Sequence, residues 1–288
     1  MRHWVSLNGV LTPAEDAKVS VFDSGFMQGI GLFETMRAYA GRVFRLERHL
    51  DRLANSARAL GWAVVPDADD LAENVHQVLS AARAADTRVR LTVTTGSLHA
   101  TDDEGPPRLT IVATASTGHA YPDECYATGV TVLVAECRQS AGDPTVGHKT
   151  TSYFARLASL RAAHAQGAME ALWLTPEDCL AEGAISNVFA VRHEELWTPP
   201  LDTPVLPGIT RATVIELAAA LEIPVREQPL TLDDARAADE LFLTNSMMEL
   251  MPVVRIEREP IGNGKPGEIT RRLALAYSDL VARECGNE

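Results

Sequence analysis

The stretch Gly147-His148-Lys149-Thr150-Thr151-Ser152-Tyr153 places a lysine in a polar loop just before an expected helix. The chain has only three lysines, Lys18, Lys149 and Lys265, against 23 arginines. A desolvated lysine can lose its proton and become a nucleophilic amine, whereas arginine keeps its proton in proteins. A bias towards arginine can also leave one lysine anywhere by chance. Position alone therefore makes Lys149 a candidate nucleophile and no more.

Length and charge limit the class of protein. The 288 residues are enough for two domains or one large α/β domain, and the hydrophobic content of 46% is that of an ordinary globular protein. The formal net charge is −13. Nucleic acids and anionic membranes attract basic surfaces, so this charge argues against binding either of them through bulk electrostatics.

Cysteines and hydropathy indicate the compartment. The four cysteines form no CxxC pair, so neither a zinc knuckle nor a redox pair is indicated, and we expect no metal site. The N-terminus lacks the apolar core of a signal peptide, and no apolar run approaches about 18 residues. We expect a soluble, cytoplasmic protein.

Hydrophobic periodicity predicts a mixed first part of the chain. Asn8-Gly9 between two apolar pairs is typical of a hairpin turn. The alternation and spacing of apolar residues predict strands over 19–22, 32–39, 89–95 and 109–114, and helices over 46–60 and 71–85.

The second part also mixes strands and helices. We expect strands over 130–135, 171–174, 187–191 and 240–244, and helices over 151–166, 209–221 and 267–283. Phe154, Leu157 and Leu160 should form the inner face of the helix over 151–166. The polar stretch between the two parts predicts a small α+β domain at 1–117, a linker at 118–125 and a larger domain at 126–288.

Several short segments carry groups that could act in chemistry. An aldehyde cofactor with a pyridine ring and a phosphate needs a lysine, an anion for the ring nitrogen and N–H donors for the phosphate. Pro207-Gly208-Ile209-Thr210-Arg211 offers a helix N-terminus, Glu182 a carboxylate in a turn, and Arg52 a cation. Each is also compatible with an ordinary structural role: a helix start, a solvated glutamate or a surface ion pair.

Two further segments place polar groups at strands. Glu34 lies inside an apolar strand, where a charge faces either water or a buried partner. Thr244-Asn245-Ser246-Met247-Met248 follows a predicted strand and could offer hydroxyl and N–H donors.

These segments occur in an order that resembles a known family. They are Gly31 to Glu34, His49 to Leu53, Gly147 to Lys149, Ala181 to Phe189, Leu206 to Arg211, Ala238 to Phe242 and Pro252-Val253. Together they resemble the fold-type IV pyridoxal-phosphate enzymes, which include branched-chain aminotransferases, D-amino acid aminotransferases and aminodeoxychorismate lyases. The resemblance covers nearly the whole chain. It implies an α+β fold with a small N-terminal domain and a larger pseudo-barrel domain, pyridoxal 5′-phosphate as cofactor, and a homodimer.

The resemblance also implies roles for individual residues. Lys149 would hold the cofactor as an imine and move the proton between the substrate α-carbon and C4′, and Glu182 would pair with the pyridine nitrogen. The phosphate ligands would be Arg52, Ile209, Thr210, Ser246 and Met247.

The remaining implied roles concern the ring and the substrate. Leu206 would pack against the ring, Tyr153 would donate to the ring hydroxyl, and Phe33 would line the substrate pocket. Some relatives carry a non-aromatic residue in the place of Tyr153.

Candidate substrate residues divide between the members of the family. Arg90 falls where branched-chain enzymes carry an arginine, and Arg88 shares its strand face. His99 matches half of the Arg-His carboxylate clamp of D-amino acid enzymes, but no arginine stands close to it. Gln28 departs from the aromatic residue of many relatives.

The longer matching segments favour an aminotransferase. It would exchange an amino group between an amino acid, either branched-chain L or D, and a 2-oxo acid by a ping-pong mechanism. The turn at 244–248 is more like that of 4-amino-4-deoxychorismate lyase, which releases pyruvate and 4-aminobenzoate. A non-catalytic relative is the third alternative, and the presence of Lys149, Glu182 and Arg52 together argues against it.

Overall fold

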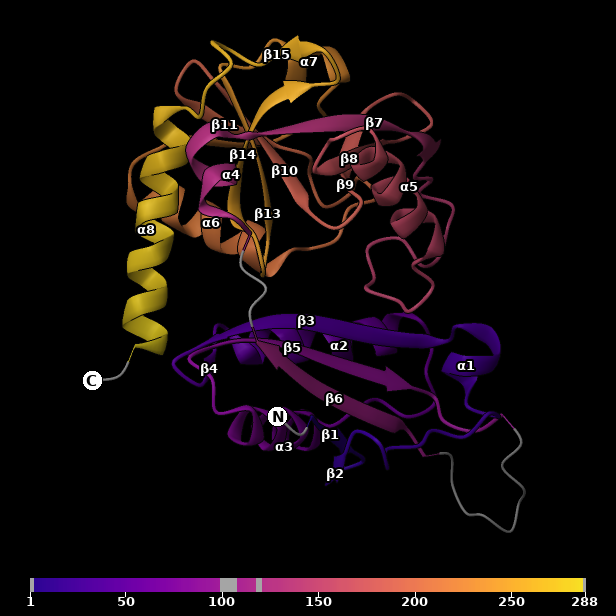
Figure 1. Ribbon diagram of the computed structural model, residues 1–288. Helices are drawn as coiled ribbons and strands as arrows, with labels where there is room; N and C mark the ends of the chain where they lie inside the picture. The colour runs from indigo at the N-terminus through magenta and orange to yellow at the C-terminus, as the bar shows by residue number, and fades with distance from the viewer. Residues whose placement is uncertain (1–2, 99–107, 118–120, 287–288) are drawn as a thin grey trace. The chain divides into compact units, whose positions relative to one another are not determined.

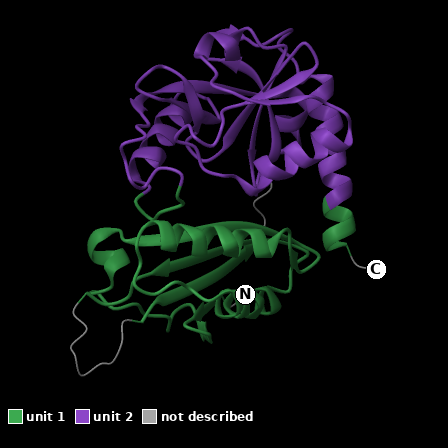
Figure 2. Cartoon of the chain, turned by 180° about the vertical axis from the view of Figure 1, so that it is seen from behind, with its two compact units in different colours: residues 1–119, 148–152, 281–288 green, residues 120–147, 153–280 purple. Residues whose placement is uncertain are grey.

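A computed structural model describes residues 3–98, 108–117 and 121–286. The chain divides into two compact units (Figure 2). Unit 1 comprises Met1–His119, His148–Ser152 and Val281–Glu288, and unit 2 comprises Ala120–Gly147 and Tyr153–Leu280. The short segment that carries Lys149 therefore belongs to unit 1, although the chain on both sides of it belongs to unit 2. The domain boundaries at 117 and 126 stay a prediction.

The described residues of unit 1 form a six-stranded antiparallel sheet with the order β2-β1-β6-β5-β3-β4 (Figure 1). Its strands are β1 (Trp4–Leu7), β2 (Val10–Pro13), β3 (Gly31–Tyr39), β4 (Arg42–Val43), β5 (Asp86–Thr94) and β6 (Thr110–Thr117). Alternation along β5 sends Val89, Leu91 and Val93 to one face, where they are fully buried. The opposite face of β5 carries Arg88 and Arg90.

Helices cover the apolar face of this sheet. The helices of unit 1 are α1 (Ser24–Gln28), α2 (Leu46–Ala59) and α3 (Ala68–Ala82). Leu50, Leu53 and Ala57 of α2 recur at three- and four-residue spacing, so they share one stripe that packs on the sheet core. The sequence pattern that predicted α2 is confirmed, and α3 begins three residues before its predicted start.

Unit 2 is built on a mixed sheet of nine strands in the described residues, with the order β12-β11-β10-β13-β14-β7-β8-β9 and β15 paired to β14. The strands are β7 (Val130–Arg138), β8 (Glu170–Leu174), β9 (Leu180–Gly183), β10 (Asn187–Arg192), β11 (Glu195–Thr198), β12 (Val225–Glu227), β13 (Glu240–Asn245), β14 (Glu249–Ile256) and β15 (Glu259–Pro260). The terminal strand β9 also contacts β10, so the sheet curls back towards itself. This curl fits the predicted pseudo-barrel.

The helices of unit 2 are α4 (Asp123–Thr128), α5 (Phe154–Ala165), α6 (Ile209–Ala220), α7 (Leu232–Arg236) and α8 (Glu268–Cys285), whose last residues belong to unit 1 (Figure 1). The core contains Leu172, Leu180 and Leu243, all fully buried, and the rings of Phe189 and Phe242 stack with centroids 5.1 Å apart. The α+β fold class is confirmed. No helix within the described residues is long and apolar enough to cross a membrane.

Two predictions of local structure were wrong. Residues 19–22 form a turn and irregular chain instead of a strand, and Val21 and Phe22 are exposed. The predicted inner face of α5 is also wrong, because Phe154 is 81% exposed and Leu157 is 40% exposed in the single chain. The buried side of α5 carries Ala163, with Leu160 packed against the same cluster.

Candidate active site

The backbone of the Lys149 segment pairs with β3. The N–H of Phe33 donates to the Lys149 carbonyl at 2.8 Å, and the N–H of Thr151 donates to the Gly31 carbonyl at 2.8 Å. A Cβ on Gly31 would lie 2.9 Å from the Thr151 hydroxyl oxygen and 3.1 Å from the Val93 carbonyl oxygen. Glycine at position 31 therefore permits the close approach that fixes the main chain of Lys149.

The Lys149 side chain lies against an aromatic ring that also contacts an arginine. Its Nζ is 4.7 Å from the ring centroid of Phe33, and the guanidinium carbon of Arg90 is 3.9 Å from the same centroid. Phe33 is only 4% exposed. A cation close to an aromatic face is attracted by the ring quadrupole, and burial strengthens that attraction. Three predicted site residues thus meet within unit 1.

Arg88 stands on the same strand face, two residues from Arg90. The sheet register pairs Thr35 with Arg90 and Arg37 with Arg88. Arg37 forms an ion pair with Asp86 at 2.6 Å, whereas the Arg88 Nε is buried without a hydrogen-bond partner in the described residues. This face of the sheet therefore carries cationic groups beside the Phe33 ring, which favours an anionic ligand.

On the helix-covered face, Glu34 forms a buried ionic network with α2. Arg52 donates to Glu34 from Nε at 2.8 Å and from Nη2 at 2.6 Å, and His49 Nδ1 lies 2.8 Å from Glu34 Oε2. Burial acts to raise the pKa of Glu34, but the charge of Arg52 and the bond to His49 outweigh it and hold the pKa at about 2. Burial lowers the pKa of His49, so the neutral ring donates its Nδ1 proton to the carboxylate. The charge of Glu34 is therefore neutralised by a buried partner, Arg52.

In unit 2, the Glu182 carboxylate is buried and accepts four hydrogen bonds. Its Oε1 accepts from Arg156 Nη2 at 2.6 Å and from Gln139 Nε2 at 3.1 Å. Its Oε2 accepts from the Leu206 N–H at 2.9 Å and from Asn187 Nδ2 at 3.3 Å. Glu182 is 2% exposed. Glu182 lies in strand β9 and not in a turn as expected, and its buried side chain faces inward, unlike that of a solvated surface glutamate.

A second buried carboxylate shapes the turn that follows Glu182. Glu170, which is fully buried, accepts from the backbone N–H groups of Ala171, Ala184 and Ile185 and from the Ser186 hydroxyl. Burial raises the pKa of Glu170 above its ordinary value although these donors act in the other direction. By joining β8 to the β9–β10 turn, Glu170 fixes the backbone that follows Glu182.

Helix α6 begins beside the carboxylate of Glu182. Gly208 is its N-cap, and the first N–H groups of any helix, here those of Ile209 and Thr210, have no acceptor within the helix. A Cβ on Gly208 would collide with the Asn187 side chain, which donates to the Leu206 carbonyl at 2.9 Å. The helix start is thus held close to the anion of Glu182, and its N–H groups suit a phosphate.

The turn after β13 carries Ser246 and Met247, whose part in binding a phosphate stays a prediction. Asn245 Oδ1 accepts from the N–H groups of Met247 and Met248, both at 2.8 Å, so the Met247 N–H is already engaged. Ser246 is partly exposed between them. The Thr244 hydroxyl is buried without a hydrogen-bond partner in the described residues, which leaves a donor for an added acceptor.

The roles of the other predicted residues stay a prediction. Tyr153 is the N-cap of α5, and the Arg156 guanidinium lies 5.7 Å from its ring centroid. Gln28 ends α1 and is exposed. His99 lies outside the described residues.

Sequence reasoning missed Gln139, Arg156 and Glu170. A glutamate inside the apolar run Met169 to Leu174 was a signal for Glu170, as it was for Glu34. Gln139 and Arg156 carried no such signal, because they reach Glu182 from segments 43 and 26 residues away along the chain.

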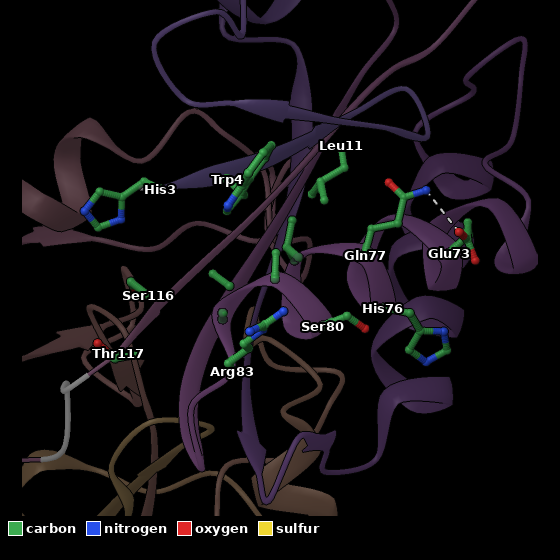
Figure 3. A pocket seen from close by; sticks show the side chains of 14 residues that line it. His3, Trp4, Leu11, Glu73, His76, Gln77, Ser80, Arg83, Ser116 and Thr117 are labelled. Atoms are coloured by element: carbon green, nitrogen blue, oxygen red, sulfur yellow. Dashed lines mark hydrogen bonds between the residues drawn. The ribbon is translucent and has the colours of Figure 1, made fainter. Parts of the chain in front are cut away.

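A separate cavity of about 920 Å³ lies in unit 1, and its labelled lining includes Trp4, Leu11, His76 and Arg83 (Figure 3). None of the predicted site residues lines it. A cavity lined by mixed side chains without a convergent charged cluster gives no reason to place chemistry there.

The two α+β units match the fold of fold-type IV aminotransferase structures. The family described as Amino-transferase class IV matches residues 31–256. The chain belongs to this family, and it is a transaminase by class.

Named relatives agree over nearly the whole chain. A putative branched-chain-amino-acid aminotransferase of Methanocaldococcus jannaschii is 36% identical over 279 residues, covering 96% of each chain. A D-alanine aminotransferase of Listeria monocytogenes is 29% identical, covering 98% of this chain and 97% of its own. The holo-form structure of a branched-chain amino acid aminotransferase of Thermobaculum terrenum, in its PLP form, has a TM-score of 0.86 at 25% identity, covering 99% of this chain and 97% of the other.

The Glu34 network predicts a specific loss of stability in acid. The folded pKa of about 2 lies below the ordinary value of 4.5, so the stabilising contribution is complete above pH 4.5 and is lost as the pH falls towards 2. The difference corresponds to about 3 kcal/mol in total, of which about 2 kcal/mol is lost by pH 3. Between pH 7 and pH 3, the free energy of unfolding measured in urea should fall by about 2 kcal/mol more in wild type than in Glu34→Gln. Equal losses would contradict the network.

Proposed function

We propose that this aminotransferase takes a branched-chain L-amino acid as donor and a 2-oxo acid as acceptor, with Lys149 as the catalytic amine. The observation that carries the proposal is the position of Lys149. Its main chain is fixed by two hydrogen bonds to β3, and its Nζ faces a ring shared with Arg90. The lyase alternative has no support among the three relatives, which are all named aminotransferases.

Pyridoxal 5′-phosphate is the cofactor, and the residues present fit it. The donor set contains a lysine for the aldehyde, a buried carboxylate for the ring nitrogen, and the α6 N-terminus with the unpaired Thr244 hydroxyl for the phosphate. When bound, the cofactor supplies an aldehyde that takes up the amino group and a ring that withdraws electrons.

The roles of the chain's residues follow from their chemistry. Lys149 Nζ would hold the aldehyde carbon of the cofactor, and as a free amine it would accept and return the α-proton of the donor. Glu182 would pair with the pyridine nitrogen, and Tyr153 would donate to the ring hydroxyl.

The phosphate is bound by N–H and hydroxyl donors. We assign it to Ile209, Thr210 and Ser246, because a helix N-terminus favours an anion. Arg52 adds a cation whose Nε and Nη2 already donate to Glu34, so it acts as an oriented, charge-compensated donor. The Met247 N–H is a weaker candidate because Asn245 accepts it, and Leu206 contributes ring packing beside its bond to Glu182.

The substrate carboxylate is assigned to the cationic strand face. Arg90 and Arg88 lie two residues apart beside Phe33, and an arginine fork matches a carboxylate in geometry as well as charge. The relative from Methanocaldococcus jannaschii supports the branched-chain donor, and the Listeria monocytogenes relative keeps a D-amino acid as the competing donor.

A homodimer is proposed from an exposed apolar surface around α1. Val21, Phe22, Phe26 and Met27 are 61%, 49%, 74% and 51% exposed, and the N–H of Leu98 donates to the Phe22 carbonyl, which brings Leu98 to the same surface. Exposed apolar side chains gathered in one segment are typical of an interaction site, and a second copy of the chain is the occupant we propose.

We also propose that the protein resides in the cytoplasm. Cys125, Cys137, Cys179 and Cys285 are all free thiols, which is the usual state in a reducing compartment.

Lys149→Ala should abolish turnover while the fold is retained, because the variant lacks the amine that we assign to holding the aldehyde and moving the proton. Circular dichroism and transaminase assays measure the two effects. Lys265→Ala is the matched control, since Lys265 is exposed at a bend. Borohydride reduction of the holoenzyme followed by peptide mass spectrometry should locate the cofactor on Lys149. An active Lys149→Ala enzyme would end the assignment.

A single amino acid added without a 2-oxo acid should bleach the visible absorbance of the bound cofactor, because the donor half-reaction needs no acceptor. We expect L-leucine or L-valine to bleach it and D-alanine to leave it unchanged. Bleaching by D-alanine alone would show that the donor is a D-amino acid and not a branched-chain L-amino acid. Absorbance that no amino acid changes would move the function to the lyase.

Phe26→Glu should convert the dimer to a monomer, since a charge in an apolar interface is costly to desolvate. Light scattering after size-exclusion chromatography gives the mass of each species. Leu201→Glu is the control, because Leu201 is 52% exposed outside this surface. A wild-type mass of one chain at micromolar concentration refutes the dimer.

A further inference from the structure

Arg156 uses its guanidinium entirely around Glu182. It projects from the first turn of α5, and its Nη2 donates to Glu182 Oε1 at 2.6 Å and to Gln139 Oε1 at 2.9 Å. Its Nη1 donates to the carbonyls of Gly183 and Ala184, each at 3.2 Å. The side chain thus binds both the carboxylate and the backbone of the turn that presents it.

The carboxylate of Glu182 has little capacity left for another donor. Two carboxylate oxygens offer about four lone-pair sites. Arg156, Gln139, Asn187 and the Leu206 N–H already supply four hydrogen bonds. A pyridine N–H therefore has to share an oxygen with a donor that is already bound.

The charge of Glu182 is also opposed at short range. The ion pair with Arg156 is largely buried, the side chains being 20% and 3% exposed, so the attraction is stronger than at a surface. Burial acts to lower the pKa of Arg156, but Glu182, Tyr153 and Glu170 reverse this and raise it, so Arg156 stays charged. Among the described residues of unit 2, Tyr153 and Glu170 also favour the charged form of Arg156.

We propose that Arg156 is a positioning residue that holds Glu182 in place and offsets its negative charge. At a given pH, a smaller fraction of the pyridine nitrogen of the bound cofactor is then protonated than beside the same carboxylate without Arg156. The inference rests on the proposed function, because it assigns the pyridine nitrogen to Glu182. As a consequence, the cofactor ring withdraws electrons less strongly. Arg156 has this effect although it touches neither the substrate nor the reacting carbon.

The test compares holoenzymes of wild type, Arg156→Gln and Arg156→Lys, loaded with pyridoxal phosphate labelled with ¹⁵N in the ring. Nitrogen NMR and the pH dependence of the visible absorbance report the protonation of the ring nitrogen. Arg161→Gln is the matched control, since Arg161 is exposed on the same helix. Arg156→Gln should raise the pKa of the ring nitrogen by about 1 unit, whereas Arg156→Lys, which keeps the charge, should return it towards wild type.

The outcomes separate this inference from the proposed function. A wild-type protein that binds no pyridoxal phosphate sinks the proposed function itself. A wild-type holoenzyme whose ring nitrogen titrates as in Arg156→Gln overturns only the role of Arg156. Should Arg156→Gln fail to hold the cofactor, Arg156→Lys decides: a ring nitrogen that stays protonated to higher pH than in wild type refutes charge compensation.

Discussion

The pairing of residues 148–152 with β3 is the constraint on which the candidate site depends. Two main-chain hydrogen bonds, from Phe33 to Lys149 and from Thr151 to Gly31, decide where the lysine side chain begins. Backbone bonds inside a sheet edge move little, so the Nζ is positioned by the fold and not by a mobile loop. The ring of Phe33, next along the same strand, then gives the amine an apolar neighbour, and Arg90 completes the group on the adjacent strand.

The buried glutamates Glu34 and Glu170 solve the same physical problem in opposite ways. Glu34 is kept ionised by a cation and a neutral histidine, so its pKa is low. Glu170 is surrounded by neutral N–H and O–H donors, and burial prevails, so its pKa is raised. Hydrogen bonds from neutral groups can satisfy a carboxylate without compensating its charge. The first arrangement joins a helix to a sheet, and the second holds a turn.

Sequence patterns predicted what depends on local periodicity or on the order of family segments. The stripe of α2 and the alternation of β5 require only neighbouring residues, and the motifs around Lys149 and Glu182 predicted their roles. The failures have a common cause. Phe154, Leu157, Val21 and Phe22 are apolar residues that a single chain leaves exposed, so apolar character did not indicate the inner side. The sequence did not indicate Arg156 and Gln139, because they reach Glu182 only when segments distant along the chain fold together.

The interleaving of the chain limits how this architecture can be divided. The chain passes from one unit to the other after His119, Gly147, Ser152 and Leu280. A fragment ending at residue 119 would lack the lysine segment, and the N–H of Phe33 and the carbonyl of Gly31 would lose the partners they have in the whole chain. Such a bare strand edge is a template for pairing with other chains. Gene fusion or recombination at a single junction therefore cannot transplant the first unit together with its lysine segment.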